Sequence, residues 1–296
     1  MDIALLTRGP GLYSTRRLAE AATNRGHRID MIDHTQCALL LNGEGGKIMI
    51  NGRFHEVPDV IIPRIGASVT TLGASVIDHF KLMGVPSLTS SEGLRLARDK
   101  WRCQQLLTSA GVDCPATLLC TDPAEARRCA RTLGRYPLVV KMLEGTHGIG
   151  VALVHNRYQL EHTCDGFLNF HPQVLIQEYI EEARGSDLRI FVVGDQIVAA
   201  MERQARRGEF RANMHLGATA RVTELSAEER QLALKVVDLL GLEVAGVDIL
   251  RSRRGPLVME INASPGLEGI ENTTGVDIAG AIIKLAEHKA RVSLSA

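Results

Sequence analysis

The feature that most constrains this sequence is a pair of apolar runs near its C-terminal end, LEVAGVDIL and PLVMEIN, joined by the turn RSRRG. Short apolar runs bounded by turn residues are typical of buried strands. The second run carries Glu260 and Asn262 toward the protein interior and ends at Ser264-Pro265-Gly266. Because a buried carboxylate without a partner is costly, the fold must provide a partner for Glu260.

The two runs predict an antiparallel hairpin. We expect the five-residue loop Arg251–Gly255 to place Leu250 opposite Pro256. In that register Asp248 faces Val258, because successive residues of paired strands stay opposite one another. The hairpin therefore determines which side chains of the second strand lie near Asp248.

Side chains alternate between the two faces of a strand, so Asp248, Glu260 and Asn262 are expected on one face. Glu260 then lies diagonal to Asp248, within reach of a shared ion. Two carboxylates and an amide oxygen are an all-oxygen ligand set of the kind that Mg²⁺ prefers. The alternative is an edge strand with solvated acids, but the apolar residues around these three favour burial.

A glycine-rich segment, KMLEGTHGIGV, follows a second apolar run. Lys141 precedes the loop, and Gly145, Gly148 and Gly150 lie in it. Their order matches neither the dinucleotide-binding fingerprint nor a Walker A loop. A glycine-rich turn between two strands can still lay backbone N–H groups over phosphates, although an ordinary flexible hairpin has the same composition. His147 has no visible partner in the sequence and is expected to contact phosphate at most.

The rest of the chain predicts an α/β protein. Strands alternate with helices over residues 1–90, which favours an open parallel α/β unit. We expect one long helix over residues 91–111 and a hairpin turn at Asn51-Gly52. Asp122 is a candidate helix N-cap, and Ser226 with Glu229 forms a candidate capping box.

Composition excludes several classes of protein. Lys plus Arg and Asp plus Glu number 34 each, so net charge gives no reason to expect a nucleic-acid partner. No run reaches the roughly 18 apolar residues that a membrane span needs, and the N-terminal apolar stretch is too short for a signal peptide. The six cysteines are scattered without a CxxC motif, so we expect reduced thiols and a cytoplasmic location.

Taken together, these segments resemble the ATP-grasp superfamily, and most closely its RimK-type α-L-glutamate ligases. The resemblance covers the whole chain. Its carriers include LYSTRRL, ARDKWR, PLVVKMLEGTHGIGV, QEYI, GDQIVAAMER, FRANMHLGATA, VAGVDIL and GPLVMEINASPGLEGIE. The last four, in this order and spacing, are specific for the branch, whereas the glycine loop and the metal triad are shared more widely across the superfamily.

The resemblance implies a role for individual residues toward ATP. Lys100 and Lys141 resemble the two lysines that hold ATP phosphates. The segment Glu178-Tyr179-Ile180 resembles the hinge that binds adenine through backbone groups. Further residues implied at the nucleotide are Asp187 at the ribose, and Arg211 and Asn213 at the γ-phosphate and the reacting carboxylate.

The same resemblance implies that Asp248, Glu260 and Asn262 hold two Mg²⁺ (or Mn²⁺) ions, with Glu260 bridging them. Arg64 and Arg203 are implied as binders of substrate carboxylates. Catalysis is expected from positioning and from charge neutralisation by the metals, Lys141, Arg211 and Asn213.

Simpler readings of some of these residues remain open. Lys100 is also compatible with a solvated helix position and Asp187 with a turn cap. Arg189 alternates with Asp187 on one strand face and is compatible with a simple ion pair to it.

We therefore predict an ATP-grasp fold with an α/β domain at residues 1–95, a central lobe at 96–180 and a C-terminal lobe at 181–296. The implied activity is ATP-dependent addition of free L-glutamate to the C-terminal carboxylate of a small-subunit ribosomal protein, with poly-α-glutamate as a further product. The implied assembly is a homo-oligomer, with a tetramer favoured. Alternatives are a ligase of a small cofactor or amino-acid carrier protein, and a non-catalytic ATP-binding regulator.

Overall fold

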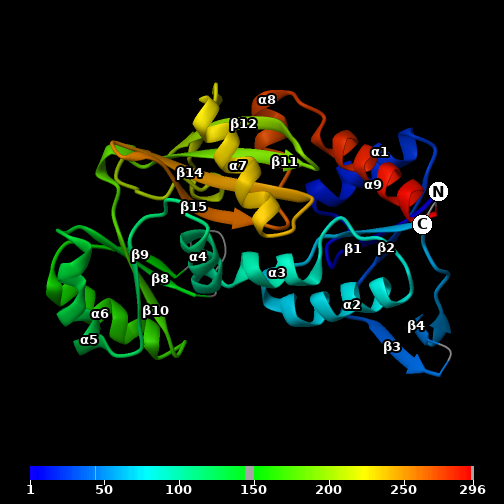
Figure 1. Cartoon of the computed structure of the whole chain (residues 1–296), viewed down its shortest axis with the longest axis horizontal. Coiled ribbons are helices and arrows are strands. Elements are labelled where there is room, and N and C mark those ends of the chain that lie inside the picture. The colour runs from blue at the N-terminus through cyan, green and yellow to red at the C-terminus, as the bar shows by residue number, and fades with distance from the viewer. Residues whose placement is uncertain (44, 144–149, 295–296) are drawn as a thin grey trace.

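The computed structural model describes residues 1–43, 45–143 and 150–294. Four sheets arranged in three parts make up this portion of the chain (Figure 1). In the view of Figure 1 the central lobe lies at the left, the five-stranded C-terminal sheet at the top and the N-terminal part at the right. Short 3₁₀ turns occur at Ala67–Val69, Ala130–Leu133, Glu181–Ala183 and Met214–Leu216.

The N-terminal part is built on a three-stranded parallel sheet with the order β2-β1-β6. Its strands and helices are β1 (Asp2–Leu6), α1 (Tyr13–Asn24), β2 (Arg28–Ile32), β6 (Val60–Pro63) and α2 (Thr70–Leu82). Successive residues of β1 enter different cores: Leu6 packs with one cluster, and Ile3 and Leu5 with another. The predicted open α/β unit is therefore confirmed, with β1 and β6 buried on both faces and the edge strand β2 largely exposed.

A small antiparallel sheet projects from this part at the lower right of Figure 1. Its strands are β3 (Cys37–Asn42), β4 (Gly45–Ile50) and β5 (Arg53–Phe54). The predicted turn at Asn51-Gly52 is confirmed, because φ is +51° and +74° at these residues, as a tight hairpin turn requires. Strand β3 was not predicted.

The helix expected over residues 91–111 is wrong in one respect, because the structure divides it into α3 (Ser91–Arg98) and α4 (Lys100–Ser109). Asp99 lies between them in an extended conformation, and its carboxylate accepts hydrogen bonds from the N–H groups of Trp101 and Arg102. A short acidic side chain at this position caps a new helix, and that cap ends α3.

The central lobe is an antiparallel sheet with the order β7-β10-β8-β9. Its elements are β7 (Thr117–Cys120), α5 (Pro123–Cys129), β8 (Leu138–Met142), β9 (Val151–Val154), α6 (Arg157–Leu168) and β10 (Val174–Glu178). Helices α5 and α6 pack together against one face of the sheet, where Val140, Leu160 and Ile176 share a core. The N-cap predicted at Asp122 is confirmed, whereas α6 was not predicted.

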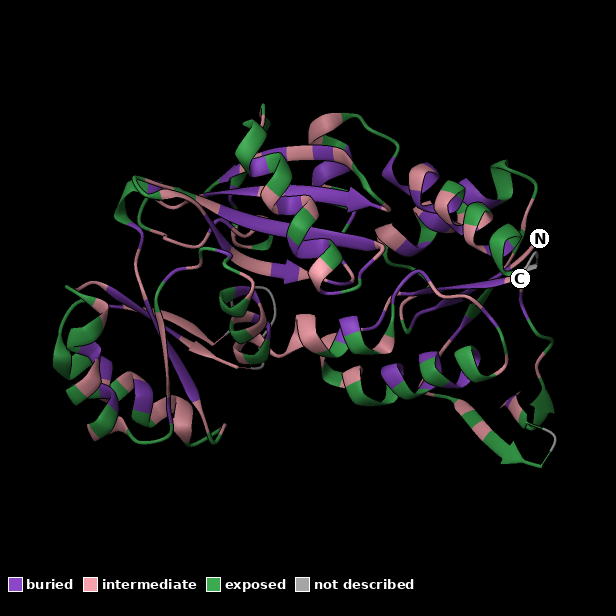
Figure 2. Cartoon of the chain, viewed as in Figure 1, coloured by how far each residue is buried: buried purple, intermediate pink, exposed green. Residues whose placement is uncertain are grey.

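The C-terminal lobe is a five-stranded antiparallel sheet with the order β13-β12-β11-β14-β15. Its elements are β11 (Ser186–Val193), β12 (Gln196–Gln204), β13 (Thr219–Val222), α7 (Ala227–Leu239), β14 (Val244–Ser252), β15 (Gly255–Asn262), α8 (Glu268–Thr274) and α9 (Ile278–Leu294). Helix α7 lies across the sheet with its exposed side outward (Figure 2). The predicted capping box of Ser226 and Glu229 starts α7.

The register predicted for the β14–β15 hairpin is wrong. The turn is tighter than expected: Ser252 pairs with Gly255, and Arg251 rather than Leu250 lies opposite Pro256. A register shift between Asp248 and Ile249 then follows. A bulge of this kind adds one residue to one strand and re-aims the side chains beyond it.

As a result of the bulge, Asp248 lies directly opposite Glu260, not diagonal to it. Asn262 lies opposite Gly246 on the same two strands. The tighter turn and the bulge both shift the register, and together they leave the carboxylates of Asp248 and Glu260 on one face of the sheet.

The N-terminal and C-terminal parts share a core. Helix α9 packs against α1, and Leu18 of α1 belongs to the same apolar cluster as Phe191 and Ile282 of the C-terminal part. The division of the chain at residues 95 and 180 remains a prediction, because this cluster crosses it. Among the described helices, none has the length and apolar character needed to cross a membrane.

Candidate active site

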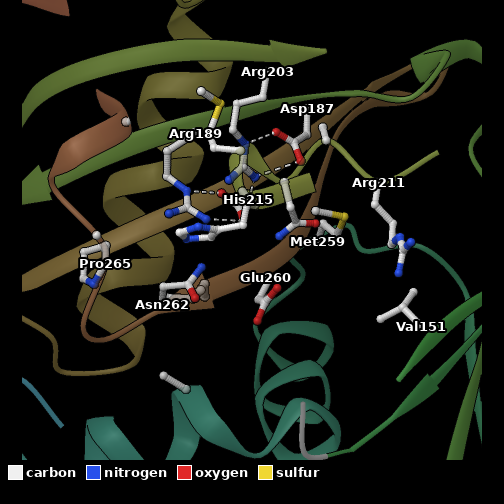
Figure 3. Close-up of a pocket in the computed structure, with 18 of the residues that line it drawn as sticks. Val151, Asp187, Arg189, Arg203, Arg211, His215, Met259, Glu260, Asn262 and Pro265 are labelled. Atoms are coloured by element: carbon white, nitrogen blue, oxygen red, sulfur yellow. Dashed lines mark hydrogen bonds and ion pairs between the residues drawn. The ribbon is translucent and has the colours of Figure 1, made fainter. Parts of the chain in front are cut away.

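A cavity of about 1320 Å³ lies between the four-stranded and five-stranded sheets and reaches the end of the N-terminal sheet. Figure 3 shows its floor, which β11, β12, β14 and β15 form with side chains that point inward. The cavity brings together nearly all of the described residues that the sequence predicts for the site. These are Arg64, Lys100, Lys141, Glu178, Tyr179, Ile180, Asp187, Arg203, Arg211, Asn213, Asp248, Glu260 and Asn262.

The glycine-rich loop is only partly described. Gly145, His147 and Gly148 lie outside the described residues. Gly150 is described at φ +74° but does not line the cavity. A Cβ atom there would lie 2.7 Å from the Met142 sulfur, and the positive φ favours glycine at this position.

Two lysines approach the cavity from different elements. Lys141 on β8 donates to Gln177 Oε1 at 2.7 Å, and Lys100 at the start of α4 donates to the Leu143 carbonyl at 2.9 Å. Burial lowers the pKa of Lys141 to about 8; Glu260 opposes this shift and Lys100 adds to it. A buried ammonium beside a second one favours an anionic ligand, and the phosphates of a nucleotide have the matching charge.

The segment predicted as the adenine hinge, residues 178–180, begins at the last residue of β10. The Glu178 carboxylate accepts a hydrogen bond from the Ala116 N–H at 2.7 Å and pairs with Arg254. It therefore ties the central lobe to the β14–β15 turn. Tyr179 meets Phe210 edge to face, with ring centroids 6.5 Å apart. These contacts make an apolar wall that is suited to a flat base.

The floor of the cavity carries a chain of four alternating charges (Figure 3). Arg203 pairs with Asp187 through two contacts of 2.6 and 2.8 Å, and also lies 3.0 Å from Asp248. Arg189 pairs with Asp248 through both carboxylate oxygens.

The ion pair considered between Arg189 and Asp187 is therefore wrong. The registers of the sheet explain the actual partners. Asp187 lies opposite Arg203 across β11 and β12, and Arg189 lies opposite Asp248 across β11 and β14. Cross-strand neighbours approach more closely than residues that alternate along one strand.

The two carboxylates of this chain differ in their pKa. Burial raises the pKa of Asp187 to about 6, although Arg203 opposes the shift. Burial also acts to raise the pKa of Asp248, but Arg189 and Arg203 outweigh it, so that the pKa is lowered. Asp248 is therefore the carboxylate that stays ionised under all ordinary conditions.

The ligand set fits a magnesium ion in part. Within the described ranges no group donates a hydrogen bond to the Glu260 carboxylate or to the side-chain oxygen of Asn262, and the buried Nδ2 atom of Asn262 has no partner either. Oxygen atoms of these two side chains are thus available to a hard cation. Asp248 already accepts from two guanidinium groups, so its role as a metal ligand remains a prediction.

Arg211 and Asn213 lie on the segment between β12 and β13. Arg211 binds the Glu209 carboxylate at 2.8 Å, and this bond is the main reason why the pKa of Glu209 falls to about 2. Its guanidinium carbon also lies 5.7 Å from the centre of the Phe210 ring. The arginine is therefore fixed beside the wall formed by Tyr179 and Phe210.

Sequence reasoning missed three polar residues of the cavity wall. Gln177 holds Lys141, Arg189 holds Asp248, and Arg98 lies at the end of α3. Arg189 carried a signal, because it alternates with Asp187 on a strand. Arg98 precedes Asp99-Lys100 directly, and only the unexpected helix break shows that it turns toward the cavity.

Comparison with known proteins defines the class first. A solved structure described as a RimK domain protein ATP-grasp from Sphaerobacter thermophilus superposes with a TM-score of 0.73 at 24% identity, covering 97% of this chain and 100% of that one. The ATP-grasp ligase PsnB, complexed with a minimal precursor, superposes with a TM-score of 0.77 at 22% identity, covering 97% and 98%. At these identities the likeness establishes the fold, and the predicted ATP-grasp fold is confirmed.

The family follows from the sequence. The RimK PreATP-grasp domain matches residues 1–94 and the RimK-like ATP-grasp domain matches residues 97–286. The chain belongs to this RimK-like ATP-grasp family and is an ATP-dependent ligase.

Curated relatives match over nearly the full length. A protein of Serratia proteamaculans (strain 568) named "Probable alpha-L-glutamate ligase" is 49% identical over 291 residues, which are 98% of this chain and 97% of that protein. A protein of Shewanella sp. (strain MR-4) named "Probable alpha-L-glutamate ligase 2" is 47% identical over 292 residues, with the same coverage.

Proposed function

We propose that this protein joins the amine of free L-glutamate to a carboxylate at the C-terminus of a small-subunit ribosomal protein. Two observations together carry the proposal. The cavity is lined by cationic side chains, and the chain is 47–49% identical over nearly its full length to proteins named as probable α-L-glutamate ligases. Poly-α-glutamate is the product expected when glutamate itself serves as acceptor.

The proposed reaction has two steps. A carboxylate oxygen of the acceptor attacks the γ-phosphorus of ATP, and ADP leaves, which gives an acyl phosphate. The glutamate amine then attacks the acyl carbon, inorganic phosphate leaves, and the amine loses a proton. No covalent nucleophile of the protein is needed, so the protein contributes position and charge.

The residues of the cavity divide this work. Lys100 and Lys141 hold phosphate oxygens, and the wall formed by Tyr179 and Phe210 holds the base. Arg211 neutralises the charge that develops on the transferred phosphoryl group. The Glu209 carboxylate and the Phe210 ring hold this guanidinium at the cavity wall.

Glu260 and Asn262, with Asp248 as a further ligand, would hold two magnesium ions. Bound magnesium neutralises phosphate charge and aligns the oxygens of the reacting group. The pairs that Asp248 makes with Arg189 and Arg203 fix its orientation within the sheet.

A small cofactor or an amino-acid carrier protein is the second candidate for the acceptor. Some structures of the same fold favour a peptide acceptor, since PsnB is described in complex with its precursor, and MdnC of Microcystis aeruginosa in complex with the precursor peptide MdnA. The same proposal includes reaction in the cytoplasm by a homotetramer, which light scattering tests directly.

The experiment combines ATP, magnesium and purified protein with each amino acid in turn, with and without the ribosomal acceptor, and follows ADP release. Glutamate should stimulate release more than the other amino acids, and the acceptor should stimulate it further. Release that responds to glutamate alone would retain the ligase but remove the ribosomal target. Release that responds equally to another amino acid would contradict the glutamate assignment.

A further inference from the structure

A pair of half-buried arginines lies at the N-terminal end of the cavity, apart from the chain of charges on its floor. Arg64 follows β6 and Arg98 is the last residue of α3. Both line the cavity. The resemblance implied Arg64 as a binder of a substrate carboxylate, but the mechanism above uses neither residue, and the sequence did not single out Arg98.

Each guanidinium is held by neutral groups. Arg64 donates to the Pro265 carbonyl at 2.6 Å, and Arg98 donates to the Ile65 carbonyl at 2.7 Å. The Nε atom of Arg98 is buried and has no hydrogen-bond partner. Among the described residues, neither group forms an ion pair with a carboxylate. The pair therefore retains hydrogen-bond donors that no carboxylate of the described residues occupies.

The two groups also act on each other. Burial, and then the charge of Arg98, lower the pKa of Arg64 to about 10. Burial lowers the pKa of Arg98 as well, although Glu260 opposes this shift. Two like charges buried together are unfavourable, and an anion placed between them relieves both the repulsion and the missing hydrogen bonds.

The backbone fixes where the pair points. The Arg64 N–H donates to the Leu6 carbonyl at 2.8 Å, which continues the pairing of β6 with β1. Asp99 ends α3 directly after Arg98 and turns the chain into α4. Ser264, whose hydroxyl is buried without a partner, lies next to Pro265 and also lines the cavity. The end of β6, the end of α3 and the segment after β15 thus bring hydrogen-bond donors to the same end of the cavity.

We propose that Arg64 and Arg98 form a subsite that binds one carboxylate of a substrate of the ligation. Guanidinium groups bind carboxylates through paired hydrogen bonds, which gives both affinity and orientation. This inference rests on the proposed function in one respect, namely that the carboxylate belongs to glutamate or to the acceptor. Either source supplies the same chemical group, and the experiment separates them.

The test compares Arg64→Gln, Arg98→Gln and Arg98→Lys with the wild type. Arg102→Gln is the matched control, because this arginine lies exposed on α4 and does not line the cavity. We expect Arg64→Gln and Arg98→Gln to raise the KM of one carboxylate substrate at least about tenfold. The KM for ATP should stay within about twofold, and Arg98→Lys should recover part of the loss.

The source of the carboxylate follows from which KM changes. If the subsite holds the side-chain carboxylate of glutamate, the wild type prefers glutamate to glutamine and Arg98→Gln loses that preference. If it holds the acceptor, the acceptor KM rises and the preference is unchanged. Equal KM values for both substrates in wild type and Arg98→Gln would overturn the proposal.

A binding measurement keeps the inference independent of turnover. Glutarate has two carboxylates and no amine, so it binds without reacting. It should raise the thermal unfolding temperature of the wild type and of Arg102→Gln, but not that of Arg64→Gln or Arg98→Gln. A wild type without glutamate-dependent turnover that still shows this pattern would remove the proposed function and keep the subsite. An equal rise in all four proteins would exclude the subsite.

Discussion

At the scale of single residues, the cavity separates charges that are already paired from charges that await a ligand. Asp187, Arg203, Asp248 and Arg189 neutralise one another on the floor. Glu260 stands beside this chain without such a partner among the described side chains. Glu260 is half-buried and faces the cavity, and a carboxylate left free in this way is a suitable ligand for a hard cation, so Glu260 should be the residue on which metal binding depends most.

Glu260→Gln should therefore reduce ATP turnover by about 10²-fold or more, because the amide keeps the shape but loses the charge that holds magnesium. Steady-state ADP release measures the effect, and circular dichroism checks that the fold is kept. Glu92→Gln, an exposed acid on α3, is the control and should keep full activity. Wild-type turnover by folded Glu260→Gln protein would remove the metal assignment.

The position of a single residue could be predicted where the side-chain alternation of its own strand determines that position. The two-residue period of a strand was sufficient to bring Glu260 and Asn262 to one face. The partners of Asp187 and Asp248 depend instead on the registers among β11, β12 and β14, which no local pattern contains. For the same reason Arg98 could not be found, since its place depends on where α3 ends.

At the scale of elements, the break between α3 and α4 positions two cavity residues. Arg98 ends one helix and Lys100 begins the next, and Asp99 between them supplies the cap. A continuous helix would rotate these residues by a fixed 100° each and could not direct both side chains to the cavity. The cap is thus a functional feature as well as a stabilising one.

Asp99→Ala tests this role against Asp122→Ala, which removes the equivalent cap of α5 in the central lobe. Each substitution should cost about 1 kcal/mol in the free energy of unfolding, measured by urea denaturation. Only Asp99→Ala should also raise the KM for ATP. A loss of about 1 kcal/mol in ATP binding corresponds to a rise of roughly three- to tenfold. If both variants changed the KM alike, the break would have no special role in the site.

The sequence predicted which helices and strands exist more accurately than it predicted where they begin and end. Strands β11, β12, β14 and β15 and the capping box of α7 followed from apolar runs and cap residues, whereas β13 was not predicted. The bulge at Met259, opposite the step from Asp248 to Ile249, could not be predicted, because a bulge depends on the match between two strands and not on either one. Helix α6 was missed, since its buried residues are few and its pattern is weak.

At the scale of the whole molecule, the C-terminal helix fastens the N-terminal part to the rest. Glu287 of α9 binds Arg25 at the end of α1 through two contacts of 2.7 Å, and His27 at 2.6 Å. The apolar faces of α1 and α9 meet beside these contacts. Since the cavity takes residues from both parts, this contact helps to hold the cavity together.

The stability of this contact should depend on pH. The hydrogen bond from Arg25 is the main cause that lowers the pKa of Glu287 to about 2 from an ordinary value of 4.5. The stabilisation is therefore complete above pH 4.5 and is lost as pH falls from there toward 2.

Glu287→Gln should be less stable than the wild type at pH 7 by on the order of 1 kcal/mol, and this difference should shrink between pH 5 and about 3. Urea denaturation at a series of pH values measures it. Glu228→Gln, an exposed acid on α7, serves as the control. A difference for Glu287→Gln that is constant over this range would contradict the assignment.

The overall arrangement was predictable only through resemblance. Alternating strands and helices indicated an α/β unit near the N-terminus, but nothing local indicated that α9 returns to pack on α1. Contacts between residues more than 250 positions apart, such as that between Arg25 and Glu287, leave no periodic trace in a single sequence. The ATP-grasp arrangement came from motifs, and the comparisons confirm it.

The most direct test of the account is the fate of the carboxylate oxygen. An acceptor peptide whose C-terminal carboxylate carries ¹⁸O is incubated with the protein, ATP, magnesium and glutamate, and its intact mass and the released phosphate are measured together. The account predicts an acceptor heavier by whole glutamate residues and one ¹⁸O in phosphate for the first amide formed. Amide formation with unlabelled phosphate, or with the label in AMP, would contradict activation through an acyl phosphate.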